Sequence, residues 1–271
     1  MSLSKRLEDA RKAYASGDAE ASARAHDPKR IAASMQEQHG GAGSQYLGSY
    51  VYGGLDGIIT TFAVVSGVAG AQLDFGVVII LGLANLLGDG FSMATGAYLS
   101  AKSDREYYER ERQREAWEVE HFPESEKEEL HQLYLSQGYP EEDAAKMVEI
   151  KSRDHTRWVD AMMIEELGML PDDRKPIKEA LATFVSFIVA GAIPLLIYVI
   201  GWLAKLSIPD QTLFLISTGL SAAALFALGA AKSLVTNRNA IISGLEMLGV
   251  GGAAAGVAYG VGVLLHSLGV G

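Results

Sequence analysis

The chain has 271 residues, a formal net charge of −10 and no cysteine. The lack of cysteine excludes a disulfide-stabilised fold and any cysteine-ligated zinc or iron–sulfur site. The negative charge argues against nucleic acid as a partner, because phosphate attracts basic surfaces. Residues 102–179 hold 22 of the 33 acidic and 13 of the 23 basic side chains, whereas residues 46–101 hold three charges and residues 180–271 hold five. This uneven distribution excludes an ordinary soluble globular protein.

The first 45 residues are polar and rich in alanine, serine and charged side chains. They contain no apolar core of the kind found in a secretory signal peptide. We expect a weak surface helix, a flexible arm, or both.

Five apolar stretches follow, each near the roughly 20 residues that a helix needs to cross a bilayer. They are rich in Gly, Ala, Ser and Thr, and these small residues let membrane helices approach one another closely. Pro194 predicts a kink in the third stretch. The expected spans are Tyr46–Ala71, Phe75–Ala101, Ile177–Leu203, Leu213–Leu234 and Ala240–Leu265. The chain thus divides into an arm (1–45), spans one and two (46–101), a charged insert (102–175) and spans three to five (176–271).

The basic residues predict how the spans are oriented. The loop between the first two spans, AQLDFG, has no Lys or Arg, whereas the charged insert has many. We therefore expect the N-terminus and the insert in the cytoplasm and, with an odd number of spans, the C-terminus on the far side. We expect a bacterial inner membrane rather than a vacuolar one.

The charged insert has the pattern of three helices. SDREYYERERQREAWEVEHF contains neither Gly nor Pro, so the second span is expected to continue as one long helix as far as Pro123. A second helix is expected from Pro123 to Gly138, and a third from Tyr139 to near Gly168. Three such helices would pack as a small bundle at the membrane surface.

Three side chains within the first two spans are candidates for a metal site. Asp56 lies in the first span, and Asp89 and Met93 lie four residues apart on one face of the second. A charged side chain at membrane depth costs roughly 2.5–3.5 kcal/mol on insertion scales, so it usually serves a function. Carboxylates with a thioether sulfur favour a transition metal over Mg²⁺ or Ca²⁺. The alternative is that Asp89 bonds to neighbouring hydroxyls and Met93 only packs.

The same carboxylates suggest coupling to protons, with Asp89 in a secondary, proton-coupling role. Burial raises the affinity of a carboxylate for protons, whereas a bound cation lowers it. Because protons and a divalent metal ion compete for the same oxygen atoms, such a site exchanges one for the other.

The charged insert carries a second set of candidate ligands. Each expected helix has one pair of potentially ligating side chains three or four positions apart. The pairs are Glu115 with Glu118, Glu126 with Glu129, and Met162 with Glu166. If the helices fold back on one another, these residues form a concave acidic face with one sulfur, suited to divalent cations. The alternative for any one of these glutamates is a solvated surface charge.

Two E-x-x-H pairs, Glu118–His121 and Glu128–His131, suggest a competing site. On the long helices of a ferritin-like bundle this spacing builds a di-iron oxidase centre. Here the pairs lie ten residues apart on short helices across Pro123, and the frame of four long helices is missing.

Several stretches, in this order and with this five-span layout, resemble the vacuolar iron transporter family of Fe²⁺/H⁺ exchangers, as a bacterial-type member. They are YGGLDGIITTFAVVSGVAGA, GDGFSMATGAYLS, the Glu-rich helices that end in MMIEELGM, ATFVSFIVAGAIPLL and SGLEMLGVGGAAAGVAYGVG. They cover nearly everything from residue 46 to residue 265, and the N-terminal arm lies outside the resemblance. One departure is Ala97, at a position that is often acidic in the family.

The resemblance implies a homodimer with the ion path along the subunit interface. It implies that Asp56 and Met93 form the transmembrane metal site. It also implies that a cytoplasmic three-helix domain collects the ion before transport. The ligands implied in that domain are Glu115, Glu118, Glu126, Glu129, Met162 and Glu166.

We therefore expect an all-α integral membrane protein with five transmembrane helices and a cytoplasmic three-helix metal-binding domain inserted between the second and third spans. Its expected function is transport rather than catalysis: proton-coupled export of divalent metal, chiefly Fe²⁺, with Mn²⁺, Co²⁺ and Zn²⁺ as further substrates and no organic cofactor. The expected partners are a second copy, membrane lipid, metal ions and protons, but no nucleic acid. Two alternatives stay open: a membrane-anchored di-iron ferroxidase, and a metal storage or sensing protein.

Overall fold

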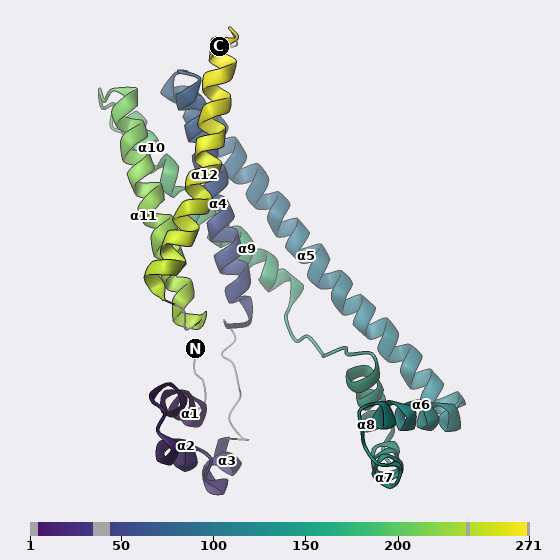
Figure 1. Ribbon diagram of the computed structural model, residues 1–271. Helices are drawn as coiled ribbons and strands as arrows, with labels where there is room; N and C mark the ends of the chain where they lie inside the picture. The colour runs from purple at the N-terminus through teal and green to yellow at the C-terminus, as the bar shows by residue number, and fades with distance from the viewer. Residues whose placement is uncertain (1–4, 35–43, 237–238, 270–271) are drawn as a thin grey trace. The chain divides into compact units, whose positions relative to one another are not determined.

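The computed structural model describes residues 5–34, 44–236 and 239–269, and these residues form helices and no strands (Figure 1). Five helices in the described part are long and apolar enough to cross a membrane. They are Leu47–Gly70, Phe75–His121, Pro176–Leu203, Asp210–Ser233 and Ala240–Ser267. Each overlaps one of the five expected spans, so the predicted number and order of apolar helices are confirmed.

The chain separates into two compact units, residues 1–97 with 177–271 and residues 98–176. The first unit contains the apolar helices and the second contains most of the charge. The apolar elements are α4 (Leu47–Gly70), the first part of α5 (Phe75–His121), α9 (Pro176–Gly191), the 3₁₀ turn η3 (Ile193–Leu195), α10 (Leu196–Leu203), α11 (Asp210–Thr236) and α12 (Ala240–Ser267).

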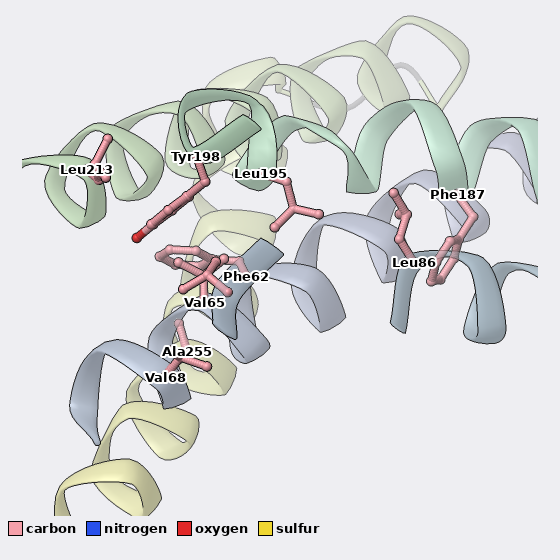
Figure 2. Close-up of a cluster of buried hydrophobic side chains, with 10 residues drawn as sticks. Phe62, Val65, Val68, Leu86, Phe187, Leu195, Tyr198, Leu213 and Ala255 are labelled. Carbon is pink, nitrogen blue, oxygen red and sulfur yellow. The ribbon is translucent and has the colours of Figure 1, made fainter. Parts of the chain in front are cut away.

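In the apolar unit, α4, α11 and α12 pack along one another (Figure 1). α4 also contributes to a core that includes side chains from α5, α9, α10, α11 and α12. The buried side chains of this core are Phe62, Val65, Val68, Val78, Leu86, Phe187, Leu195, Tyr198, Leu213 and Ala255 (Figure 2). Met93 of α5 packs against this core and is partly buried.

Glycine allows α4 and α9 to pack closely beside Asp56. A Cβ atom at Gly57 would overlap the carbonyl oxygen of Phe187 and would lie 3.1 Å from the amide nitrogen of Gly191. Small residues permit this kind of backbone contact between membrane helices. Because Asp56 directly precedes Gly57, the contact fixes the place of Asp56 within the bundle.

The predicted kink at Pro194 is confirmed. α9 ends at Gly191, and the 3₁₀ turn Ile193–Leu195 leads into α10. Proline cannot donate a backbone hydrogen bond, so the break leaves backbone groups to be satisfied in another way. The Ser217 hydroxyl on α11 donates to the Pro194 carbonyl oxygen at 2.6 Å, which satisfies one of these groups.

The second unit begins at Tyr98 and includes the polar part of α5. At 1.5 Å per residue, a 47-residue helix is about twice as long as the hydrocarbon core of a bilayer is thick. Residues 102–121 carry twelve charged side chains, so this part of α5 lies outside the membrane-spanning segment. The predicted continuation of the second span as one helix as far as Pro123 is confirmed.

Three shorter helices complete this unit: α6 (Pro123–Ser136), α7 (Glu141–Ser152) and α8 (His155–Ala161), followed by a π-helical turn at Met162–Glu166. The expectation of one helix from Tyr139 to near Gly168 was wrong. Asp154 accepts a hydrogen bond from the Arg157 amide at 2.9 Å and so caps a new helix. The core contains Val119, Leu130, Tyr134, Ala144, Val148, Trp158, Val159, Met162 and Met163.

The described part of the N-terminal arm is helical. It forms three short helices, α1 (Lys5–Ser16), α2 (Ala19–Ala25) and α3 (Pro28–Ser34). An ion pair of 2.7 Å joins Arg30 to Asp9.

Candidate metal-binding sites

The transmembrane candidates come from two neighbouring apolar helices. Asp56 on α4 and Asp89 on α5 are both half-buried, and they are close enough for the charge of Asp89 to act on Asp56. No described residue forms a hydrogen bond or an ion pair with either carboxylate; the Thr60 hydroxyl bonds to the backbone oxygen of Asp56 instead, at 2.9 Å. The alternative in which Asp89 bonds to neighbouring hydroxyls therefore finds no support among the described residues.

Met93 lies one helical turn beyond Asp89 on α5. It is half-buried and packs against the apolar core, which the alternative of a Met93 that only packs also predicts. Two carboxylates and one sulfur are the ligand types that a borderline-soft divalent metal accepts.

In the polar unit, three of the six candidate ligands point inward. Glu115 is 1% exposed, Glu126 is 4% exposed and Met162 is fully buried. One carboxylate oxygen of Glu126, Oε2, is buried and has no hydrogen-bond partner in the described part of the chain. Buried carboxylates are costly unless a counter-charge compensates them, so these positions require a cationic partner or a proton.

The five glutamates form one electrostatic cluster. Loss of hydration raises the pKa of Glu115 to about 7; Arg114 opposes this rise, whereas Glu166, Glu118 and Glu129 add to it. Loss of hydration, together with the charges of the other four glutamates, raises the pKa of Glu126 to about 7. The pKa of Glu166 is also raised; loss of hydration is the largest cause, and the charge of Glu129 is the second. Helices α5 and α6 and the π-helical turn therefore bring together the carboxylates that the sequence singled out.

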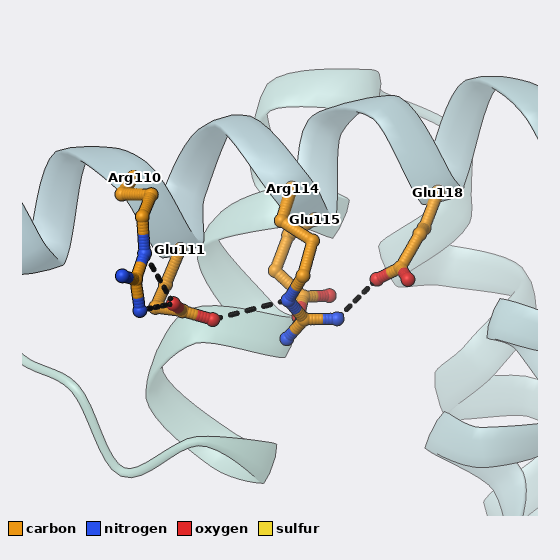
Figure 3. A network of polar contacts seen from close by, with 5 residues as sticks. All are labelled: Arg110, Glu111, Arg114, Glu115 and Glu118. Atoms are coloured by element: carbon orange, nitrogen blue, oxygen red, sulfur yellow. Dashed lines mark hydrogen bonds and ion pairs between the residues drawn. The ribbon is translucent and has the colours of Figure 1, made fainter.

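A feature that the sequence analysis missed is a basic residue within this cluster. Arg114 forms ion pairs with Glu111, Glu115 and Glu118, and Arg110 binds the same Glu111 carboxylate (Figure 3). The four-residue spacing of Arg114 and Glu118 on one helix was the available signal.

Met162 and Glu166 begin and end the π-helical turn. The Leu167 amide bonds to the Met162 carbonyl oxygen, five residues back, at 3.1 Å. Met162 is buried in the apolar core of the unit, whereas Glu166 is exposed. π-Helical turns are rare and are often found at functional sites.

The described residues contain no ready-made group of three His, Asp or Glu side chains placed to hold a metal ion. The histidines of the two E-x-x-H pairs lie beside groups that are not the glutamates of those pairs. The Nδ1 atom of His121 lies 2.8 Å from the Trp117 carbonyl oxygen, and the Nε2 atom of His131 lies 3.3 Å from Glu141. The geometry of a di-iron oxidase centre is not formed by these residues.

Comparison with known proteins identifies related chains. A family model described as the VIT family matches residues 47–263. A vacuolar iron transporter of Toxoplasma gondii is 40% identical over 268 residues, which cover 96% of this chain and 88% of that protein. A vacuolar iron transporter of Plasmodium falciparum is 36% identical over 270 residues, 98% of each chain. Vacuolar iron transporter 1 of Oryza sativa is 31% identical over 212 residues, 78% of this chain and 82% of that protein.

The alignment with the Plasmodium protein covers 98% of this chain, so it includes most of residues 1–45. The N-terminal arm lies outside the residues that the family model matches, as expected, although the alignment with this relative extends into it. The family and its relatives also exclude the ferroxidase alternative. The chain belongs to the VIT family and is a membrane transporter rather than an enzyme.

Proposed function

We propose that this protein exports divalent transition metal, chiefly Fe²⁺, from the cytoplasm in exchange for protons. The relatives named vacuolar iron transporters support iron as the substrate. The observation that carries the proposal is that Asp56 and Asp89, on two apolar helices that follow each other in the chain, are both half-buried and have no hydrogen-bond partner among the described residues, while the charge of Asp89 acts on Asp56. Such groups are costly in a membrane and serve to bind cations or protons.

In the proposed cycle, the deprotonated carboxylates of Asp56 and Asp89 take the ion together with the Met93 thioether. Protons arriving from an acidic far side then occupy the carboxylate oxygens and displace the ion. Oxygen and sulfur together favour Fe²⁺, Mn²⁺, Co²⁺ and Zn²⁺ over Mg²⁺ and Ca²⁺.

The polar unit, residues 98–176, is proposed to lie in the cytoplasm and to collect the ion. Its acidic surface raises the local concentration of cations. Its candidate ligands are the same five glutamates with Met162. The pKa values of about 7 for Glu115 and Glu126 mean that these groups exchange protons for metal close to neutral pH.

A homodimer is proposed because one chain supplies few ligands to the transmembrane site. Asp56, Asp89 and Met93 are each half-buried, so a second copy can reach them and complete the coordination. The ion would then pass between the two copies.

The test is uptake of Fe²⁺ by liposomes that contain the full chain and an acidic lumen. Asp56→Asn keeps the shape of the side chain and removes its charge, and it is expected to lower the uptake rate at least about tenfold. The matched control is Asp74→Asn, because Asp74 is exposed and, among the described residues, its side chain accepts a hydrogen bond from the local Gly76 amide alone, at 2.7 Å. Uptake by this control is expected to match that of the unsubstituted protein.

A storage or sensing protein predicts a different result. It binds metal, but it moves none into the vesicles, whatever residue occupies position 56. Equal uptake by the Asp56→Asn and Asp74→Asn proteins would also contradict the proposal, because Asp56 would then play no part in the ion path.

A further inference from the structure

Arg114 holds two of the candidate ligands through one guanidinium group. Its Nη1 atom donates to Glu118 and its Nη2 atom donates to Glu115. Its Nε atom donates to Glu111 at 3.0 Å (Figure 3). Glu111 is not a candidate ligand, so this single side chain links the candidate site to a carboxylate outside it.

The carboxylates that Arg114 holds differ in their access to water. Glu115 is 1% exposed, so its charge depends on a nearby cation. The side chain of Arg114 is 43% exposed, so the guanidinium can turn out toward solvent without unpacking the core. The arginine is therefore the movable partner of a fixed, buried carboxylate.

The cluster also holds more negative charge than Arg114 neutralises. Oε2 of Glu126 is buried and no described residue bonds to it, and the charges of Glu115 and Glu118 act on this carboxylate. An acidic cluster with a buried, unpartnered oxygen requires a further cation or a proton, and a divalent ion supplies two charges at one point.

We propose that Arg114 is a tethered competitor for the metal ion. Its guanidinium occupies oxygen atoms of Glu115 and Glu118 that the ion needs, and the ion binds only when the guanidinium gives them up. This inference rests on the proposed role of the glutamate cluster in collecting metal. Arginine keeps its charge throughout the physiological pH range, so the competitor itself does not titrate.

Glu111 gives the displaced guanidinium a remaining partner. Its side chain is 14% exposed, and Arg110 holds it through two bonds of 3.0 and 2.7 Å. Arg114 therefore keeps the Nε bond when the other two bonds are lost. The competition lowers the affinity of the cluster for the ion and speeds release of the ion. Fast release is needed at a site that collects ions for transport.

The test is a calorimetric titration of the purified full chain with Mn²⁺ alone at about pH 8, where proton competition is reduced. Arg114→Gln is expected to tighten the Kd by roughly fivefold or more, because the competitor is gone. Arg105→Gln is the matched control. It makes the same change in charge on the same helix, and Arg105 pairs with Glu109 at 2.8 Å rather than with the cluster. Its Kd is expected to stay within about twofold of that of the unsubstituted protein.

Arg114→Lys keeps the charge, but lysine cannot bridge several carboxylates as a guanidinium does. Its Kd is therefore expected to lie between that of the unsubstituted protein and that of the Arg114→Gln protein. This variant decides the case if Arg114→Gln unfolds the polar unit. An unchanged or weakened affinity in Arg114→Lys, or in a folded Arg114→Gln protein, overturns the inference.

The double variant Glu115→Gln with Glu118→Gln separates the two proposals. If it loses Mn²⁺ binding while Arg114→Gln gains no affinity, the cluster collects metal and Arg114 does not compete for it. If the double variant binds Mn²⁺ as tightly as the unsubstituted protein, the collecting role fails, and the inference about Arg114 fails with it.

Discussion

Glu115 on α5 and Glu126 on α6 are both almost fully buried, and the charge of Glu115 helps to raise the pKa of Glu126 to about 7. The two helices adjoin at Phe122, so the turn between them brings one carboxylate toward the other. A pair of this kind is stable when a proton or a cation is present and is strained when both groups are ionised.

The first prediction concerns the stability of the polar unit as a function of pH. The pKa of Glu126 in the folded chain, about 7, lies above its ordinary value of 4.5. The folded state therefore binds more protons than the unfolded state between these values, and stability falls as pH rises from about 4.5 to about 7. Hydrogen exchange of the α6 amides, measured across this range without added metal, is expected to quicken beyond the intrinsic effect of pH.

Glu126→Gln removes this penalty. At about pH 8 the opening free energy of α6 is expected to rise by about 1–3 kcal/mol relative to the unsubstituted chain. Glu124→Gln is the control, because the Glu124 side chain is 86% exposed on the same helix. Lower stability of the Glu126→Gln protein at this pH would show that the ionised carboxylate is well compensated in the folded chain.

The second prediction concerns the protons released when metal binds. Metal takes the deprotonated carboxylates, and the pKa values of Glu115 and Glu126 are both about 7. Binding of Mn²⁺ at about pH 6 is expected to release protons, and binding at about pH 8.5 is expected to release almost none. Calorimetry in buffers of different ionisation enthalpy measures the number of protons released per ion bound. Equal release at both pH values would mean that these two groups are not the ones that bind the ion.

The third prediction concerns packing beside Asp56. Gly57→Ala places a methyl group against the Phe187 carbonyl oxygen, and the close contact with α9 must open. Such overpacking typically costs about 1–3 kcal/mol, so the melting temperature in detergent is expected to fall and transport to fall with it. Gly48→Ala is the control on α4, since nothing lies within 4 Å of a Cβ atom there. A Gly57→Ala protein as stable as the control would contradict the close approach of α4 and α9.

The fourth prediction concerns the thioether of Met93. Met93→Leu keeps the volume that packs against the apolar core and removes the sulfur. Uptake of Fe²⁺ and Co²⁺ is expected to fall roughly threefold or more relative to uptake of Mn²⁺, because sulfur favours the softer ions. The uptake ratios in liposomes measure the change. If all three rates fall by the same factor, Met93 affects the path through packing rather than by ligating the ion.

The apolar helices could be predicted from the sequence because their signals are local. Five apolar runs of the right length predicted five helices, and the lack of Gly and Pro after residue 101 predicted that α5 continues into its polar part. Pro194 predicted the break in the third span, since proline removes a hydrogen bond wherever it lies in a helix.

The polar unit was predicted less well because its geometry depends on tertiary packing. The break between α7 and α8 carries no Gly or Pro, and its one signal was Asp154 in a capping position. The π-helical turn follows from no local pattern, and Met162 and Met163 within it are both fully buried. The role of Arg114 was missed because the sequence alone does not show which of 13 basic residues in the block 102–179 binds the cluster.

The exchange of metal for protons is tested most directly by a metal gradient imposed without a pH gradient. Liposomes that contain the full chain and a pH-sensitive dye in the lumen receive external Fe²⁺ under anaerobic conditions. If metal and protons exchange, the lumen becomes alkaline as Fe²⁺ enters, and vesicles with the Asp56→Asn protein show no change. Fe²⁺ entry with no more proton movement than in protein-free vesicles would contradict the account.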